Sequence, residues 1–518
     1  MGTRHKLALV DSVGLAARAR RHWLFGLVLV AALVVRILTA LAFRPIMWFG
    51  GDSASYLATG LRLIPDPSRV GGYGFMLWVL RPRLGLALHT FALVAAVQHL
   101  MGLAMGVLIY LLARRFGLPA WAATLATIPV LFDAYELQLE SDAVPDIPFG
   151  FLVLLALYLL LRAPGERRPA RTIAAAFLLG VSALLWPVGL VLLAVLLVVL
   201  LAALLIRRAG LVTVLAALLA GALPVAAYSA WFSTREHQFS LTRSDGVYLW
   251  SRTMSFADCA VIKPPADERV LCPPPGPRIA SSLYIWNANS PTLTMPGGRF
   301  SARTNRLALN FALRAIAAQP ADYVAAVGHD FALTFFWDRP VHPKAGIVDR
   351  YQFADAATAW VPASEYTPGG GTVAGDQAAY NGGRQPAPTR VVQPYASWLV
   401  TYQRYAYLRG TLLGVILLAA LAAMIARRRV YPAGLPWAFA VTILLVPPMI
   451  TDFDLRYLVP AVPVACLAAA LAFAPGPGGP AQRRWTTSAA ATGTSAPGET
   501  RTSSLPSEST PTAGPESA

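Results

Sequence analysis

The stretch "WLFGLVLVAALVVRILTALAF" (residues 23–43) is apolar almost throughout, and it is long enough to decide the class of fold. A helix needs roughly 20 apolar residues to cross a bilayer. Similar runs recur along the 518 residues, which are 56% hydrophobic and only 13% charged. A typical soluble domain is roughly 25% charged. The sequence therefore predicts an all-α polytopic membrane protein.

The net charge of +17 comes from arginines that flank the apolar runs and do not form one patch. Basic clusters stand at span ends in "RARRH" (18–22), "ARRFG" (113–117), "GERRPAR" (165–171), "IRRAG" (206–210) and "ARRRV" (426–430). Such clusters mark cytoplasmic loops by the positive-inside rule. This distribution argues against nucleic-acid binding and predicts a cell-membrane protein with a basic cytoplasmic N-terminus at 1–22.

All basic clusters fall on one side of the membrane if the chain has about ten transmembrane helices. We predict these helices at residues 23–43, 84–112, 119–137, 147–162, 172–187, 188–206, 211–232, 408–426, 434–450 and 455–474. No secretory signal with a cleavage site is evident, so the first run is expected to be a retained anchor. Both termini are then cytoplasmic.

The spans divide the chain into an N-terminal bundle (23–232), a polar outer domain (233–395) and C-terminal helices (396–474). Within the bundle, acidic outer loops are expected at 44–83 and 138–146. The tail (475–518) consists mainly of small and polar residues, a composition that predicts a disordered cytoplasmic segment.

Two features are expected in the outer domain. Cys259 and Cys272 bracket a Pro-containing segment on the oxidising face, which predicts a disulfide. Residues 303–337 show helical periodicity broken at Gln319-Pro320, which favours an outer helical hairpin. The second of these helices (321–337) could instead be a further span. Cys466 falls in the last span, as a small core residue.

Carboxylates are scarce, and they gather in three predicted outer loops. Asp52 and Asp66 lie in the first, and Asp452 and Asp454 lie in the last, "TDFDLRYLVPAVP" (451–463). The second loop, "LFDAYELQLESDAVPDIPFG" (131–150), carries Asp133, Glu136, Glu140, Asp142 and Asp146.

These acids have a structural interpretation and a functional one. Asp66, Asp133 and Asp146 are interpreted as helix caps, or as acids that lie outside only because arginine stays inside. Asp52 stands in "GGDSASYL" with no cationic residue beside it, where it could cap a helix or act as a general base. Pairing with a cation would lower its basicity, so we expect none.

Facing carboxylates at such a site could hold a divalent cation, Mg²⁺ or Mn²⁺, against a phosphate leaving group. Arginines near the outer ends of the late spans, Arg404, Arg409 and Arg456, could bind that phosphate through their guanidinium groups.

Together these motifs resemble the GT-C superfamily of membrane glycosyltransferases, especially polyprenyl-phosphate-dependent protein O-mannosyltransferases and lipid A aminoarabinose transferases. The resemblance rests on Asp52 followed by Tyr56 after the first span, the acidic "ELQLESD", and Arg456-Tyr457 opening "RYLVPAVP". Alanine- and arginine-rich usage and the "SFADC" segment resemble actinobacterial members.

The resemblance implies roles for these residues. Asp52 would be the catalytic base, and either Glu140 or Asp142 the second acid. Tyr56, Arg404, Arg456 and Tyr457 would bind substrate. Many members have glutamate after the loop-one aspartate, whereas this chain has a serine, which bears against a metal site there.

The implied partners are a lipid-linked sugar donor and a cell-envelope or protein acceptor outside the membrane. No P-loop or Rossmann motif is present, which fits a lipid-linked donor better than a nucleotide sugar. Two other classes stay open on the sequence: a secondary transporter or lipid flippase, and a non-catalytic GT-C-like scaffold.

Overall fold

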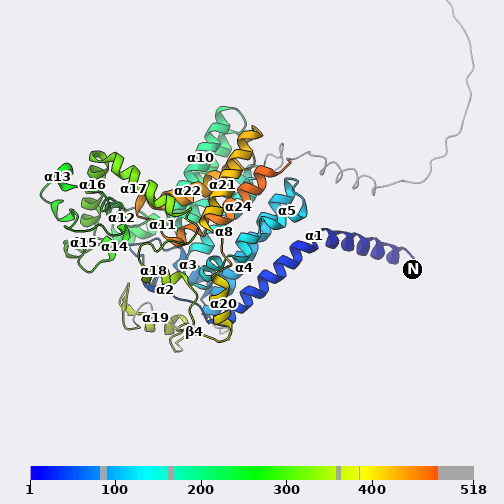
Figure 1. The fold of residues 1–518 in the computed structure, drawn as a ribbon, viewed down its shortest axis with the longest axis horizontal. Helices are drawn as coiled ribbons and strands as arrows, with labels where there is room; N and C mark the ends of the chain where they lie inside the picture. Colours follow the sequence, from blue (N-terminus) through cyan, green and yellow to red (C-terminus); the bar gives the residue numbers. More distant parts are fainter. Residues whose placement is uncertain (1, 82–89, 162–167, 357–362, 384, 476–518) are drawn as a thin grey trace, which may run out of the picture.

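A computed structural model describes residues 2–81, 90–161, 168–356, 363–383 and 385–475 of the chain. Within these ranges the fold is helical, and each of its four strands is two residues long. Figure 1 shows a bundle of long helices with a separate group of helices, α12 to α16, gathered at one end. The all-α class predicted from composition is confirmed.

The N-terminal half supplies the first part of the bundle. Its helices include α1 (Gly2–Ala42), α4 (Thr90–Arg115), α5 (Ala120–Leu125), α6 (Ile128–Phe132), α7 (Ala134–Ser141), α8 (Asp146–Leu160), α9 (Pro169–Leu185), α10 (Val188–Leu205) and α11 (Leu211–Glu236). Two further helices, α2 (Gly50–Arg62) and α3 (Gly72–Leu80), lie between α1 and α4 in the sequence.

The predicted outer domain and the C-terminal part follow. We call the helices of the first of these regions the outer helices, after their predicted location: α12 (Asp245–Thr253), α13 (Cys259–Ile262), α14 (Ser281–Trp286), α15 (Pro291–Thr294), α16 (Ala302–Ala318), α17 (Pro320–Leu333), α18 (Ala345–Val348), α19 (Val373–Tyr380) and α20 (Tyr395–Gln403). The last helices are α21 (Gly410–Ala426), α22 (Gly434–Ile450), α23 (Leu455–Leu458) and α24 (Ala461–Phe473). Strand β1 (Phe43–Arg44) pairs with β4 (Arg390–Val391), and β2 (Tyr366–Thr367) pairs with β3 (Gly371–Thr372).

Five segments in the described residues are long and apolar enough to cross a membrane. They are His22–Ala42, Phe91–Arg115, Val188–Leu205, Leu211–Glu236 and Leu455–Phe473. Shorter apolar segments are Ala120–Phe132, Asp146–Leu160, Pro169–Leu185, Gly410–Ala426 and Gly434–Ile450. These segments make the protein polytopic, while the count of ten spans and the sidedness of the termini stay predictions.

The third predicted span differs from the structure. The segment 119–137 is not one helix but α5, α6 and the start of α7. Asp133 has extended backbone angles, and its carboxylate accepts the amide hydrogens of Tyr135 and Glu136 as the cap of α7. The chain therefore bends at Asp133. Of the other expectations, the start of the second span (84–89) and the tail beyond Pro475 lie outside the described residues.

The outer helices have a core of their own. The predicted disulfide between Cys259 and Cys272 is confirmed. It lies beside buried Trp250, whose indole N–H donates to the Leu271 carbonyl over 2.9 Å. Closing a loop of this length contributes about 3 kcal/mol in the chain-entropy model. The predicted break between two amphipathic helices also falls where expected, since α16 ends at Ala318 and α17 begins at Pro320.

Candidate active site

Asp52 lies in the first turn of α2, but it does not cap the helix. The N-cap position is Phe49, whose amide donates to the Ser53 hydroxyl over 2.8 Å. Ser53 in turn donates to the carbonyl of Ala143 in the second acidic loop over 3.0 Å. The capping alternative for Asp52 is therefore wrong, and its carboxylate is directed to other partners.

Those partners are two arginines, which corrects the expectation that Asp52 has no cationic neighbour. Arg69 Nη1 lies 2.5 Å from Asp52 Oδ1, and Arg456 Nη1 lies 2.7 Å from Asp52 Oδ2. Arg69 is 17 residues away along the chain and Arg456 is 404 away. Tertiary folding alone supplies both charges, which inspection of the sequence around Asp52 did not reveal.

Arg456 also joins the last acidic loop to the second one. Its Nη2 lies 2.7 Å from Asp146 Oδ2, and its Nε donates to Asp146 Oδ1 over 3.1 Å. The interpretation of Asp146 as a simple helix cap is therefore wrong. The Arg456 guanidinium also lies over the Phe49 ring, 5.0 Å from its centroid. Such bidentate pairs fix orientation as well as charge, so Arg456 is held firmly between α2 and α8.

A tight turn in the first loop positions Arg69. Asp66 Oδ1 accepts the Ser68 amide (2.7 Å) and the Ser68 hydroxyl (2.6 Å), and Ser55 donates to Asp66 Oδ2. Asp66 Oδ2 also lies 3.9 Å from Arg69 Nε. Asp66 therefore stabilises a turn and does not cap a helix, and it places Arg69 beside Asp52.

The resulting arginine–carboxylate cluster consists of Asp52, Arg69, Asp146 and Arg456. Burial alone would raise the pKa of Asp52, but Arg69 and Arg456 outweigh it and lower the pKa to about 2. The Asp52 side chain keeps 32% of its surface exposed, whereas the other three side chains of the cluster are largely buried. The cluster therefore presents one accessible, ionised carboxylate backed by two guanidinium groups.

The second-loop acids named as catalytic candidates do not join this cluster. Glu140 Oε1 lies 2.6 Å from Arg36 Nη2, and Glu140 Oε2 lies 2.7 Å from His99 Nδ1. We call Arg36, His99 and Glu140 the buried ionic cluster. Asp142 Oδ2 instead accepts from Gln138 Nε2 over 2.5 Å. The second-loop acid that shares Arg456 with Asp52 is Asp146, which the sequence analysis had interpreted as a cap.

The other predicted substrate-binding residues lie in different surroundings. Tyr56 is buried on α2 with Arg69 over its ring at 5.8 Å. Tyr457 follows Arg456 and stacks on Trp186 with 5.1 Å between ring centroids. Arg404 is exposed at the end of α20 and makes no ion pair with Asp52. A substrate-binding role for Arg404 stays a prediction.

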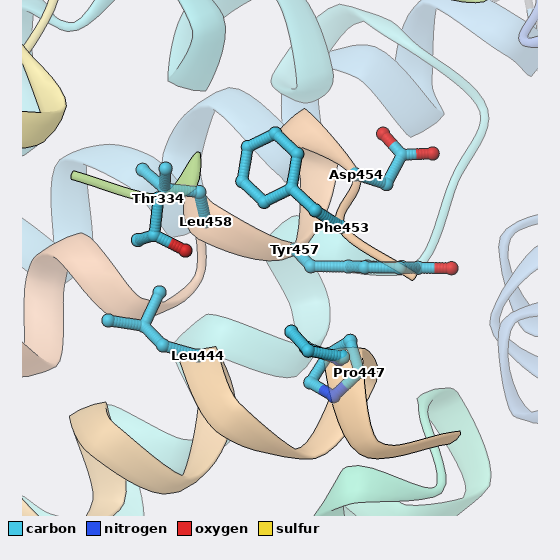
Figure 2. Close-up of a pocket in the computed structure, with 8 residues that line it drawn as sticks. Thr334, Leu444, Pro447, Phe453, Asp454, Tyr457 and Leu458 are labelled. Carbon is cyan, nitrogen blue, oxygen red and sulfur yellow. The ribbon is translucent and has the colours of Figure 1, made fainter. Parts of the chain in front are cut away.

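A small hollow lies next to the segment that carries Arg456. It has about 190 Å³ of empty space, part of it open to solvent, and its lining includes Pro447 of α22 with Asp454 and Tyr457 at α23. Figure 2 shows the flat face of the Tyr457 ring between Pro447 below and Phe453 above, with the Asp454 carboxylate at one side. Burial raises the pKa of Asp454 to about 6. Asp454, whose carboxyl group titrates near neutrality, thus lies close to Arg456 in the sequence.

The cluster does not fit a divalent cation. Both oxygens of Asp52 and both oxygens of Asp146 already accept from guanidinium groups. Mg²⁺ and Mn²⁺ require free carboxylate or other oxygen ligands, and two neighbouring cations oppose a third. Among the described residues, no group of three or more His, Cys, Asp or Glu side chains is arranged to hold a metal ion.

Sequence reasoning missed Arg69, although one signal for it existed. An arginine in an outer loop runs against the positive-inside distribution of this chain. Arg69 follows "PDPS" in a loop that also contains Asp52 and Asp66. An outer arginine near outer acids is a candidate for a buried ion pair, and that reasoning would have selected it.

Comparison with known proteins finds similar solved structures, while no family model and no curated protein matches the chain. One is ArnT from Cupriavidus metallidurans bound to undecaprenyl phosphate, at 15% identity over 86% of this chain and 77% of that one, with a TM-score of 0.36. Another is the Archaeoglobus fulgidus oligosaccharyltransferase with a tethered acceptor peptide, at 14% identity and a TM-score of 0.35. That match covers 88% of this chain and half of the oligosaccharyltransferase.

A TM-score of this size carries no argument about activity. The function below is therefore argued from the residues of this chain.

Proposed function

We propose that this protein is a GT-C-type membrane glycosyltransferase that moves a sugar from a polyprenyl-phosphate donor to a hydroxyl group outside the membrane. One observation carries the proposal: an exposed carboxylate, Asp52, lies between two guanidinium groups where three acidic loops meet. A base and a phosphate clamp are the two functions such a transfer needs, and this site supplies the residues for both.

The ion pairs of Asp52 fit a resting state that substrate rearranges. A phosphodiester is a ligand for guanidinium groups, and it would compete with Asp52 for Arg69 and Arg456. Asp146 would keep Arg456 in place through its two contacts. Asp52 would then lose its stabilising cations while staying partly buried, so its pKa would rise from about 2. Donor binding would in this way turn a weak base into a stronger one.

The transfer step follows from that arrangement. Asp52 accepts the proton of the acceptor hydroxyl, and the oxygen forms a bond to the anomeric carbon. The bond from that carbon to the phosphate oxygen breaks, with inversion, and polyprenyl phosphate leaves with the electron pair. Arg69 and Arg456 stabilise the negative charge that develops on the leaving phosphate. Every atom in this step belongs to donor, acceptor or the named side chains.

The test is transfer of label from radiolabelled polyprenyl-phosphate sugars in membranes that contain wild-type protein or Asp52→Asn. The matched control is Asp338→Asn, which removes a carboxylate that is 81% exposed and paired with Arg409 at the surface. We expect wild type and the control to transfer label and Asp52→Asn to lose transfer at equal expression. Equal transfer by Asp52→Asn would overturn Asp52 as the base, and no transfer by wild type with any donor would overturn the function.

A secondary transporter or lipid flippase is the second candidate, because the buried ionic cluster places ionisable groups at membrane depth. Its members are almost wholly enclosed, which favours a role in packing α1, α4 and α7 together. A transporter would keep its function in Asp52→Asn and lose it in Glu140→Gln. The pair of variants therefore separates the two candidates.

A further inference from the structure

A second hollow lies beside Trp48. It has about 400 Å³ of empty space, part of it open to solvent, and we call it the Trp48 groove. Its lining includes Trp48 and Asp142, with Arg350 and Gln352 contributed by the outer segment. The Phe49 ring connects the groove to the arginine–carboxylate cluster, because its centroid lies 5.0 Å from the Arg456 guanidinium and 6.0 Å from that of Arg350.

Asp142 forms the buried polar part of this groove. The residue is 1% exposed, and its Oδ2 accepts from Gln138. Burial raises the pKa of Asp142 well above its usual value. Because Asp142 lines the hollow, its carboxyl group can exchange hydrogen bonds with the hydroxyl groups of a ligand there.

The backbone around the groove is well fixed. Met47 donates its amide to the Ser141 carbonyl over 2.7 Å, and the Ala143 amide donates to the Met47 carbonyl over 3.1 Å. These bonds hold Asp142 beside the segment that carries Trp48. The Trp48 indole N–H donates to the Ala387 carbonyl over 3.1 Å, which fixes the orientation of its ring. The groove therefore combines a rigid aromatic surface with a buried carboxyl group.

We propose that the Trp48 groove binds the edge of an uncharged sugar ring. An aromatic face packs against the apolar C–H face of a sugar, and a carboxyl group exchanges hydrogen bonds with its hydroxyls. One acid alone does not suit a metal cation, and Arg69 and Arg456, which we propose bind the phosphate, do not line the groove. The inference rests on the proposed glycosyl transfer, and it assigns this groove to a saccharide of the donor or of the acceptor.

The test is saturation-transfer NMR of the full-length protein in nanodiscs with a panel of methyl glycosides of hexoses and pentoses. We expect at least one glycoside to bind wild type and Asp52→Asn alike, since Asp52 lies outside the groove. Removing the aromatic face in Trp48→Ala, or the carboxyl group in Asp142→Ala, should weaken binding about tenfold. Trp286→Ala, which removes a half-exposed tryptophan on α14, is the control and should bind normally.

A plugging variant keeps the test valid if the groove variants fold poorly. Ala356 is exposed on the rim of the groove, so Ala356→Trp should block the groove without disturbing the core. Loss of binding in Ala356→Trp supports the proposal, and unchanged binding in it and in Trp48→Ala overturns the proposal. Absence of binding by every glycoside also overturns it.

A competition experiment distinguishes the two sources of the sugar. If a polyprenyl-phosphate sugar displaces the glycoside from the groove, the groove holds the donor ring; if both bind together, it holds an acceptor saccharide. Transfer that depends on Asp52 without any glycoside binding would leave the proposed function standing and remove this inference. Glycoside binding without any transfer would remove the proposed function and leave the assignment of the groove to a saccharide standing.

Discussion

Replacing Glu140 by glutamine should destabilise the protein without touching the chemistry. Glu140 is fully buried and is the carboxylate partner of Arg36, which is 1% exposed. Breaking a buried pair by removing one charge typically costs about 3–5 kcal/mol, because the other charge stays buried. Arg36 Nη1 keeps its bond to the Leu131 carbonyl at 2.9 Å. We therefore expect Glu140→Gln to lower the free energy of unfolding by about 3 kcal/mol, at the lower end of that range.

The double variant Arg36→Met with Glu140→Leu makes the argument sharper. It removes both charges and fills their space with apolar side chains, which is often neutral or stabilising. We expect its free energy of unfolding to lie within about 1 kcal/mol of the wild-type value. The matched control is Asp338→Asn, which breaks the pair of Arg409 with a carboxylate that is 81% exposed. A surface pair contributes about 0–1 kcal/mol, so this control should change little.

The assay is SDS-induced unfolding in mixed micelles, followed by sugar transfer for each variant that remains folded. If Glu140 is structural, the double variant regains both stability and transfer. If the double variant is stable but inactive, or if Glu140→Gln loses transfer with unchanged stability, Glu140 has a chemical role and the reasoning from burial is refuted.

Three further outcomes follow from the same geometry. Arg69→Gln removes one cation from Asp52, so the pKa of Asp52 should rise. The acidic limb of the pH profile of kcat/KM should then move to higher pH. An unchanged acidic limb would contradict the role of this ion pair. Gly102→Ala would place a Cβ 1.7 Å from Glu140 Oε1, so it should destabilise the protein by about 1–3 kcal/mol, as overpacking does, and melting curves at or above wild type would count against this contact. Burial alone would lower the pKa of His342, but the nearby Asp452 outweighs it and raises that pKa above 6.5. The stabilising contribution of His342 is therefore full below pH 6.5 and is lost as the pH rises through the raised pKa. Thermal melts of His342→Gln should not show this loss.

Much of the architecture could be predicted from local composition. Long apolar runs and flanking arginines locate the helices, because burial in lipid depends on stretches of sequence about as long as one helix. The disulfide between Cys259 and Cys272 was predictable because its cysteines are 13 residues apart. The bend at Asp133 was missed because the sequence alone does not distinguish an aspartate that caps a helix from one inside an apolar run.

The candidate site could be predicted only in part. The sequence by itself determined that carboxylates gather in three outer loops and that Asp52 and Arg456 are placed where a membrane chain seldom puts charges. Only the tertiary structure decided which charges meet: Asp52 takes Arg69 and Arg456, Asp146 shares Arg456, and Glu140 is buried with Arg36. The physical reason is that helix formation follows local apolarity, whereas an ion pair needs two groups within about 4 Å, and the packing of distant helices sets that distance.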